Sequence, residues 1–498
     1  MQVNLNHKPP ENALIVIVGS GFGGLSVAYA LKKSGIHDFI LFERHDQVGG
    51  VWSRNTYPGV ACDVPSHLYS FSHFLNPNWS SEFADGREIL QYLVDFCRRH
   101  DIERHIRFNT AVTAATFNRA GGTWTVTSAA GSVTAKYFIA AVGQSSEPLI
   151  PPIPGLHDFE GNLFHSAKWD SHCTLAGKTV SVIGNAASAS QFIPIIAKIV
   201  KKLHVFQRTP NWVIPKMNHE FSEEEKHEFR SSPAALADKR GAIVQFTEIL
   251  YQFLLYSEHQ QTQEARTRES MEAQIKDPEL QKKLIPNYPA GTKRLVLSDD
   301  FLPVFERDNV ELIVDKIERI EKRGILDVTG TLRESDVIIC ATGFQATRYL
   351  ISTIKVTGRA DLDLQTLWRG GLNTEAFFGT FVHGFPNLFT VFGPNTGLGA
   401  SSVVLMIEAQ SDLIVKSIKY VEASGLKSIE VDKSVQTEFN REIQAALTKL
   451  VWTSDKVHSW FKTSEGKVTT KWPYLASEFE RRTGELQIAN GTFIFEAP

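Results

Sequence analysis

The turn between the first strand and the first helix of this chain constrains its fold more than any other segment. Residues 13–18 are an unbroken apolar run rich in β-branched side chains, which is typical of a strand covered on both faces in a parallel sheet. Residues 19–24 are rich in glycine, residues 25–34 place apolar side chains at helical spacing, and residues 38–42 are again mostly apolar. We therefore expect a βαβ unit at the very start, which predicts an α/β protein.

The glycines of this turn match the pattern G-x-G-x-x-G at Gly19, Gly21 and Gly24. In that pattern the first glycine makes the tight turn, the second lets a pyrophosphate approach the backbone, and the third lets helix and strand pack closely. The N–H groups of the helix N-terminus then face the phosphates. Glu43 ends the second strand, where it can accept hydrogen bonds from both ribose hydroxyls. The segment predicts a dinucleotide site, and the alternative is a glycine-rich turn without a ligand.

Residues 180–206 repeat the order strand, small-residue turn, helix and strand. Arg208 follows Gly184 by 24 residues, the same separation that lies between Gly19 and Glu43. A carboxylate suits a free ribose 2′-hydroxyl, whereas an arginine suits a 2′-phosphate. The sequence therefore predicts FAD in the first site and NADPH in the second. In the alternative interpretation, Arg208 is an exposed charge at the end of a strand.

The second turn departs from the pattern, because Ala186 and Ala189 replace its second and third glycines. We expect Ala186 to crowd the turn slightly and to weaken or shift pyrophosphate binding. Ser188 in this turn and Thr209 beside Arg208 are also assigned to the cofactor site.

The domain organisation follows from the two repeats. A chain of 498 residues is expected to form about two or three domains, and the stiff stretch 148–154 (PLIPPIP) indicates a boundary. We predict two Rossmann-like dinucleotide-binding domains, with FAD bound by residues 1–150 and 384–498 and NADPH bound by residues 151–383. Residues of about 218–290 are rich in Glu, Gln, Lys, Ala and Leu, and we expect them to form a helical insertion in the second domain.

Composition argues against several other classes of protein. The formal net charge of −3 gives no basic field that would attract nucleic acid, and no apolar run approaches the ~18 residues that span a bilayer. The four cysteines lie far apart without a C-x-x-C pair, so neither a redox dithiol nor a zinc-finger spacing is present. We expect no metal, no nucleic-acid partner, no integral membrane span, and a reducing, cytoplasmic environment.

A further pattern lies just before the second nucleotide motif and joins Phe159, Gly161, His165, Trp169 and Asp170. It resembles the fingerprint of type I Baeyer–Villiger monooxygenases, in the flavin-containing monooxygenase superfamily. The related flavin-containing monooxygenases end this pattern with an aromatic residue that neither Pro nor Asp follows. The resemblance covers about residues 12–480, with further matching motifs at Gly49-Gly50 with Trp52, Pro58-Gly59 with Cys62-Asp63, Arg208-Thr209, Lys293-Arg294, Thr342-Gly343 and Pro386-Asn387.

The resemblance implies a reaction cycle. NADPH passes hydride to FAD, the reduced flavin captures O₂ at C4a, and the peroxide attacks a ketone to give an ester or a lactone. It also implies that Arg294 is the active-site arginine, that Asp63 orients or balances it, and that Lys293 helps to hold the NADP phosphate. A fixed cation suits an anionic peroxide, because arginine keeps its proton at working pH. The alternatives are a surface arginine at Arg294 and a turn-forming side chain at Asp63.

The same resemblance places further residues at the cofactors. For His165, a structural role in the interdomain linker is favoured over acid–base chemistry. Residues 393–399 and Thr342-Gly343 are expected to be backbone that passes close to a cofactor, where side chains would clash. The remaining cofactor assignments are Gly50, Trp52, Asp63, Thr342, Gly343 and Asn395.

Two other functions remain open at this stage. A monooxygenase that oxidises a sulfide, an amine or a long-chain alkane on the same scaffold would depend less on Arg294, because those reactions tolerate the protonated hydroperoxide. A non-oxygenating NADPH-binding flavoprotein, such as a sensor or an electron donor, would release H₂O₂ without an oxygenated product. Ala400 stands where many similar proteins carry histidine. The sequence indicates neither the effect of Ala400, nor the substrate, nor the oligomeric state.

Overall fold

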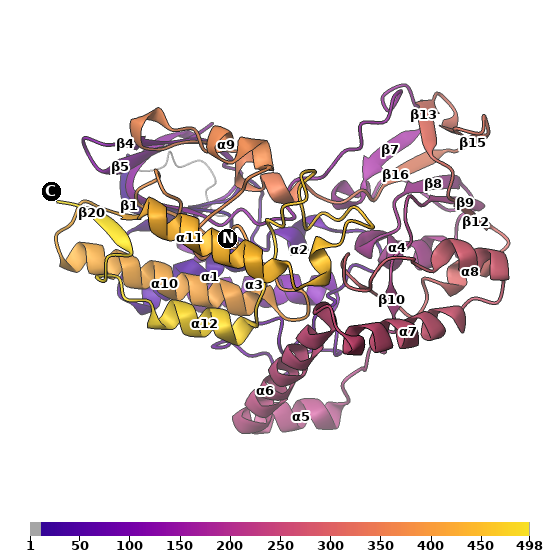
Figure 1. The fold of residues 1–498 in the computed structure, drawn as a ribbon, viewed down its shortest axis with the longest axis horizontal. Helices are drawn as coiled ribbons and strands as arrows, with labels where there is room; N and C mark the ends of the chain where they lie inside the picture. The colour runs from indigo at the N-terminus through magenta and orange to yellow at the C-terminus, as the bar shows by residue number, and fades with distance from the viewer. Residues whose placement is uncertain (1–10, 498) are drawn as a thin grey trace.

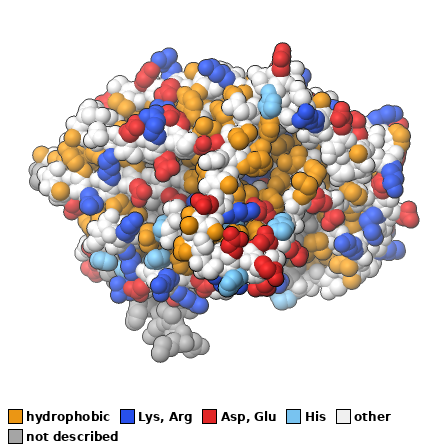
Figure 2. All heavy atoms as spheres, turned by 90° about the horizontal axis from the view of Figure 1, so that it is seen from below, with side chains coloured by type: hydrophobic (Ala, Val, Ile, Leu, Met, Phe, Trp, Pro, Cys, Tyr) orange, Lys and Arg blue, Asp and Glu red, His pale blue; other side chains and the backbone are white. Residues whose placement is uncertain are grey.

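The computed structural model describes residues 11–497, which form two sheet-centred halves with a helical arm below them (Figure 1). One half is built on an eight-stranded sheet and the other on a five-stranded sheet. Figure 2 shows the same molecule from below, where one face is hollowed and hydrophobic side chains gather around the hollow.

The eight-stranded sheet has the order β17-β4-β5-β6-β1-β2-β3, and β18 pairs with β6. β1 lies between β2 and β6 and runs parallel to both, and its residues 15–17 are fully buried, as the apolar run predicts. β4 and β5 form an antiparallel meander with β6. The bounds of these strands are β1 (Asn12–Val18), β2 (Phe39–Phe42), β3 (Ile106–Arg107), β4 (Val112–Asn118), β5 (Thr123–Ser128), β6 (Gly131–Ala140), β17 (Lys355–Thr357) and β18 (Leu388–Thr390).

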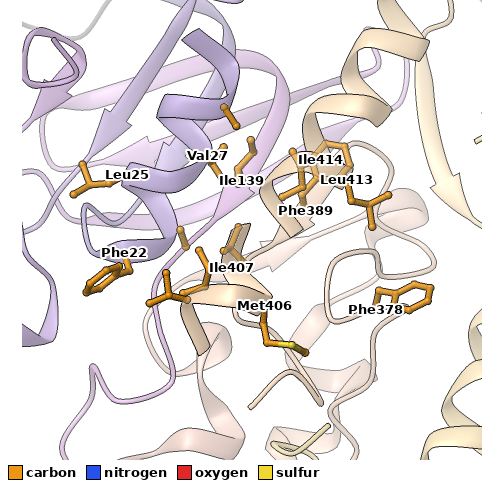
Figure 3. Packing of buried hydrophobic residues seen from close by; sticks show 14 of the residues in the cluster. Phe22, Leu25, Val27, Ile139, Phe378, Phe389, Met406, Ile407, Leu413 and Ile414 are labelled. Atoms are coloured by element: carbon orange, nitrogen blue, oxygen red, sulfur yellow. The ribbon is translucent and has the colours of Figure 1, made fainter. Parts of the chain in front are cut away.

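The core of this half joins the two ends of the chain. Helix α1 (Phe22–Lys33) packs against α10 (Val403–Ala423), and Figure 3 shows side chains of both helices meeting between them and the sheet. Within this apolar core, Ser26 Oγ and Ser411 Oγ share a hydrogen bond of 2.8 Å. The C-terminal third of the chain therefore completes the unit that the first βαβ segment begins.

The five-stranded sheet is parallel throughout, in the order β12-β9-β8-β16-β7. Helix α4 (Ala187–Ile196) follows β8 and buries Phe192 and Ile193 in the core beside the sheet. The bounds of the strands are β7 (Asn162–His165), β8 (Thr179–Ile183), β9 (Lys202–Phe206), β12 (Val310–Ile313) and β16 (Val337–Cys340).

The helical arm consists of α5 (Glu223–Ser231), α6 (Pro233–Leu250), α7 (Glu258–Glu272) and α8 (Pro278–Leu284), and it occupies the range of the expected insertion. Helix α5 begins with the Ser222–Glu225 capping box. The other elements are α2 (Val51–Arg54), α3 (Gly86–Arg99), α9 (Leu364–Leu367), α11 (Lys433–Leu447), α12 (Ala476–Glu485), β10 (Val213–Ile214), β11 (Val296–Leu297), β13 (Ile317–Glu321), β14 (Gly324–Asp327), β15 (Leu332–Glu334), β19 (Ser428–Val431) and β20 (Phe493–Glu496).

The predicted fold class is confirmed, because two parallel βαβ cores lie where the two glycine-containing turns placed them. The predicted domain ranges remain a prediction, and one strand does not follow them. β17 (Lys355–Thr357) lies inside the range assigned to the second domain, yet it pairs with β4 of the first sheet. Within residues 11–497, no helix is long and apolar enough to cross a membrane, and no cluster of side chains has the make-up of a metal site.

Candidate functional site

The first glycine turn has the shape that a bound pyrophosphate needs. Gly19 has φ +101°, and a Cβ there would lie 2.5 Å from the carbonyl oxygen of Ala141. A Cβ on Gly24 would lie 1.8 Å from the carbonyl oxygen of Gly19. At Gly21 a Cβ would make only ordinary contact, 3.5 Å from the Cα of Gly50. The fold itself therefore requires Gly19 and Gly24, whereas Gly21 keeps the N-terminus of α1 open to close approach.

Glu43 closes this turn from the end of β2. Its carboxylate is buried and accepts hydrogen bonds from Ser20 N (2.9 Å), Ser20 Oγ (2.8 Å) and His45 N (3.0 Å). A carboxylate has about four acceptor positions, so Glu43 retains capacity for a ribose hydroxyl. These residues fit the adenosine end of FAD.

The second turn has the same backbone as the first. Gly184 has φ +107°, and a Cβ there would lie 2.5 Å from the carbonyl oxygen of Ala341, which mirrors the contact of Gly19. Ala186 caps α4 at φ −86° and ψ −160°, close to the values of −80° and −166° at Gly21. This is extended backbone that any residue adopts, so alanine does not strain the turn. The predicted effect of Ala186 on a bound pyrophosphate remains a prediction.

A cluster of positive groups lies at the end of β9, beside this turn. Lys293 Nζ donates to Thr209 Oγ1 at 3.1 Å. Burial lowers the pKa of Lys293 to about 8, and the charge of the exposed Arg208 acts in the same direction. No carboxylate of residues 11–497 lies within 4.0 Å of the charged nitrogens of Arg208 or Lys293. An uncompensated pair of cations suits a phosphate group.

His458 belongs to the same cluster, although no motif of the sequence pointed to it. Burial lowers its pKa, and the charges of Arg208, Lys462 and Lys293 lower it further. A single histidine in a loop has many possible roles, so its position in the folded chain is needed to assign it.

Arg294 and Asp63 form a two-pronged ion pair across 231 residues of sequence. Arg294 Nε donates to Asp63 Oδ2 at 2.8 Å, and Arg294 Nη2 donates to Asp63 Oδ1. The side chains of Arg294 and Asp63 are 44% and 20% exposed, so the carboxylate is the more buried member of the pair and solvent reaches the guanidinium. Burial alone would raise the pKa of Asp63, but the charge and hydrogen bonds of Arg294 outweigh that effect and lower it. Asp63 in turn raises the pKa of Arg294, and both groups are therefore charged at neutral pH.

Gln191 of α4 forms hydrogen bonds to the loop that carries Asp63. No motif of the sequence identified this residue. Tyr57 Oη donates to Gln191 Oε1 at 2.9 Å, and Gln191 Nε2 donates to the carbonyl oxygen of Ala61 at 3.0 Å. Gly59 packs so closely on this helix that a Cβ there would lie 2.9 Å from the carbonyl oxygen of Gln191. The helix of the second turn therefore sets the position of the loop that leads to Asp63.

The fingerprint residues take packing and turn positions. His165 is buried at the end of β7, and its Nδ1 accepts a hydrogen bond from Ala167 N at 3.1 Å. Burial lowers the pKa of His165 to about 4, so the ring is neutral at neutral pH. Trp169 packs its ring 5.3 Å from that of Phe192, and Asp170 accepts the N–H of His172 in a turn at 2.9 Å. Phe159 lies against Gly161, where a Cβ would stand 2.6 Å from the Phe159 ring.

The remaining assigned residues lie in helices, as Trp52 in α2 and Ser188 in α4 do, or in loops. Trp52 Nε1 donates to Tyr69 Oη at 3.3 Å. Thr342 Oγ1 donates to the carbonyl oxygen of Leu149 at 2.6 Å, and Gly343 follows with φ +85°. Asn395 is buried and donates its amide N–H groups to the carbonyl oxygens of Val468 and Lys471, at 2.9 and 2.8 Å. Ser188 is half-buried in the first turn of α4.

Three comparisons with known proteins agree with this geometry. The profile of the flavin-binding monooxygenase-like family matches residues 12–358. A Baeyer–Villiger monooxygenase of Streptomyces coelicolor is 36% identical over 490 residues, which are 98% of this chain and 94% of that protein. Another, of Pseudomonas aeruginosa, is 37% identical over 94% of this chain and 89% of that protein.

Two solved structures superpose on nearly the whole of this chain. A closed crystal structure of cyclohexanone monooxygenase superposes with a TM-score of 0.89 at 27% identity, over 98% of this chain and 100% of that chain. The structure of OTEMO in complex with FAD and NADP superposes with a TM-score of 0.88 at 26% identity, over 97% of this chain and 99% of that chain.

Proposed function

The chain belongs to the flavin-binding monooxygenase-like family, and on that premise we propose that it is a Baeyer–Villiger monooxygenase. It consumes NADPH and inserts one oxygen atom of O₂ beside a ketone carbonyl, which yields an ester or a lactone. Similarity over nearly the full length to proteins named for this reaction supports the proposal.

FAD and NADPH are the two cofactors. FAD, when bound and reduced by NADPH, supplies the activation of O₂. The turn from Gly19 to Gly24, together with Glu43, would hold FAD, because it combines an open helix N-terminus with a buried carboxylate. Arg208 and Lys293 would hold the 2′-phosphate of NADPH, because their charges have no carboxylate partner within residues 11–497.

The observation that carries the catalytic proposal is the ion pair of Arg294 and Asp63. Two hydrogen bonds to Asp63 fix the plane of the Arg294 guanidinium, while its Nη1 makes no hydrogen bond to any residue from 11 to 497. We assign Arg294 the role of stabilising the negative charge that develops on oxygen during attack on the carbonyl carbon. Asp63 keeps that cation in place, and no proton needs to leave either group.

The proposal is tested by NADPH consumption with cyclic, linear and aryl ketones and with sulfides, with the products identified. We expect an ester or a lactone in amounts that match the NADPH consumed. A sulfoxide as the only oxygenated product would support the heteroatom alternative, and H₂O₂ with no oxygenated product would support a sensor or electron donor. We also propose a cytoplasmic site of action, because Cys62, Cys97, Cys173 and Cys340 are all free thiols.

A further inference from the structure

A buried lysine beside the segment 393–399 has no role in the proposed function, and its ammonium has no counter-ion among residues 11–497. Lys471 is 3% exposed, and its Nζ donates a hydrogen bond of 2.8 Å to the carbonyl oxygen of Leu398. The aromatic rings of Phe461, Trp460 and Trp452 surround the ammonium, with centroids 4.2, 5.3 and 5.9 Å from Nζ. No carboxylate of residues 11–497 lies within 4.0 Å of Nζ. Buried charges in proteins are usually paired, so this ammonium is suited to an anion that the chain does not supply.

The charged groups that act on Lys471 are those of the proposed active site. Burial lowers the pKa of Lys471 to about 7, the charge of Arg294 acts in the same direction, and the charge of Asp63 opposes it. Since Asp63 already accepts two hydrogen bonds from Arg294, it does not neutralise the second cation. Nζ also lies 3.7 Å from the point that a Cβ on Gly397 would occupy, so the ammonium adjoins a turn without side-chain cover.

Lys471 is distinct from the cluster proposed to hold the nucleotide phosphate. The charges that act on His458 are those of Arg208, Lys462 and Lys293, and Lys471 is not among them. One of the three aromatic side chains around Lys471 is in contact with solvent, because Trp460 is 39% exposed. Because the charge of Arg294 acts on Lys471, an anion bound at Lys471 would also interact with the charge of Arg294.

We propose that Lys471 determines substrate specificity by binding a carboxylate, so that the enzyme prefers ketones that carry a carboxylate over neutral ketones of the same skeleton. This inference rests on the proposed function and names the substrate class of that same site. A charge-assisted hydrogen bond to a carboxylate corresponds to about a 10- to 100-fold change in binding.

The test compares 4-oxocyclohexanecarboxylate with its neutral methyl ester in the FAD-loaded enzyme with NADPH. At about pH 6.5 we expect kcat/KM for the acid to exceed that for the ester by about 10- to 100-fold. The preference should shrink as the pH rises through about 7, because Lys471 loses its charge there and kcat/KM reports the free enzyme. Lys471→Met should abolish the preference while the ester reacts at nearly the unchanged rate, and Lys471→Arg should restore much of it. Lys467→Met is the matched control, because that ammonium is paired with Glu375.

Binding of the acid, measured by calorimetry on the same holoenzyme, keeps the inference testable whether or not either ketone turns over. We expect Lys471→Met to weaken that binding by about tenfold or more. An enzyme that oxidises acid and ester equally well refutes the inference but leaves the proposed function standing. An enzyme that binds the acid through Lys471 but oxidises no cyclic, linear or aryl ketone refutes the proposed function instead. A Lys471→Met variant that shifts the flavin reduction potential and leaves the acid preference intact would assign this charge to the flavin, and the inference would be wrong.

Discussion

The replacement of Arg294 by alanine tests the central assignment, and the geometry of the ion pair gives the size of the effect. The guanidinium donates hydrogen bonds to Asp63 from Nε and Nη2. Its Nη1 is therefore the nitrogen available to a reacting oxygen. Loss of one such donor typically lowers the rate by about 10²–10³-fold. We therefore expect Arg294→Ala to lose ketone oxygenation by about that factor and to divert the electrons from NADPH to H₂O₂.

Stability should hardly change in this variant, so a loss of activity would report on the chemistry. The Arg294 side chain is 44% exposed, and an exposed ion pair contributes about 1 kcal/mol or less to the free energy of unfolding. In a chain of this size the melting temperature should fall by about 2 °C or less. Flavin reduction by NADPH should also persist, because Arg208 and Lys293 remain in place.

The assay combines stopped-flow flavin reduction with the yields of ester, sulfoxide and H₂O₂ from one ketone and one sulfide. Sulfide oxidation should suffer less than ketone oxidation, because it does not build up the same negative charge. Arg294→Lys keeps the charge but loses the two-pronged contact, and we expect about a tenfold loss. Arg319→Ala removes an equally exposed paired arginine and serves as the control. If Arg294→Ala converts the ketone at an undiminished rate, Arg294 is not the active-site cation.

Three further predictions concern the nucleotide site and the fingerprint. Arg208→Ala should raise the KM for NADPH by about 10- to 100-fold and leave the KM for NADH nearly unchanged; equal use of both nucleotides by the parent enzyme would contradict this. Since the pKa of Lys293 is about 8, its charge is present below that pH and lost above it. We therefore expect kcat/KM for NADPH, but not for NADH, to fall by about tenfold between about pH 7 and about pH 9, and a parallel fall for both would assign the pH effect to another group. His165→Gln should lower flavin reduction and coupling modestly without changing the product, because the neutral buried ring is expected to act structurally; loss of oxygenation with intact reduction would point to acid–base chemistry.

The features that the sequence predicts well are those that local backbone geometry demands. Gly19 and Gly184 both take positive φ, and a Cβ on either would lie 2.5 Å from the carbonyl oxygen of Ala141 or Ala341. A close contact of this kind leaves glycine as the one residue that fits, so the pattern is readable without a structure. The fold class was predictable for the same reason.

The sequence was less informative about tertiary partners. β17 joins the first sheet from within the range assigned to the second domain, because its pairing with β4 depends on a contact across more than 200 residues. The cluster of His458 with Arg208 and Lys293, and the buried ammonium of Lys471, have the same origin. Each depends on where the C-terminal segment packs against the rest of the chain. Local backbone preferences of a loop do not determine that position.

The ion pair of Arg294 and Asp63 shows how these two kinds of information combine. Motif resemblance identified both residues, yet neither motif specifies the distance between them. That distance depends on Gln191, which fastens Ala61 to α4 through a hydrogen bond of 3.0 Å, and on Gly59, which allows the loop to lie directly on the helix. Helix α4 in turn begins at the turn that contains Gly184. The proposed NADPH site and the ion pair of Arg294 and Asp63 are therefore both positioned by α4. A displacement of α4 would therefore also displace the loop of Asp63, and with it the partner that orients the Arg294 guanidinium.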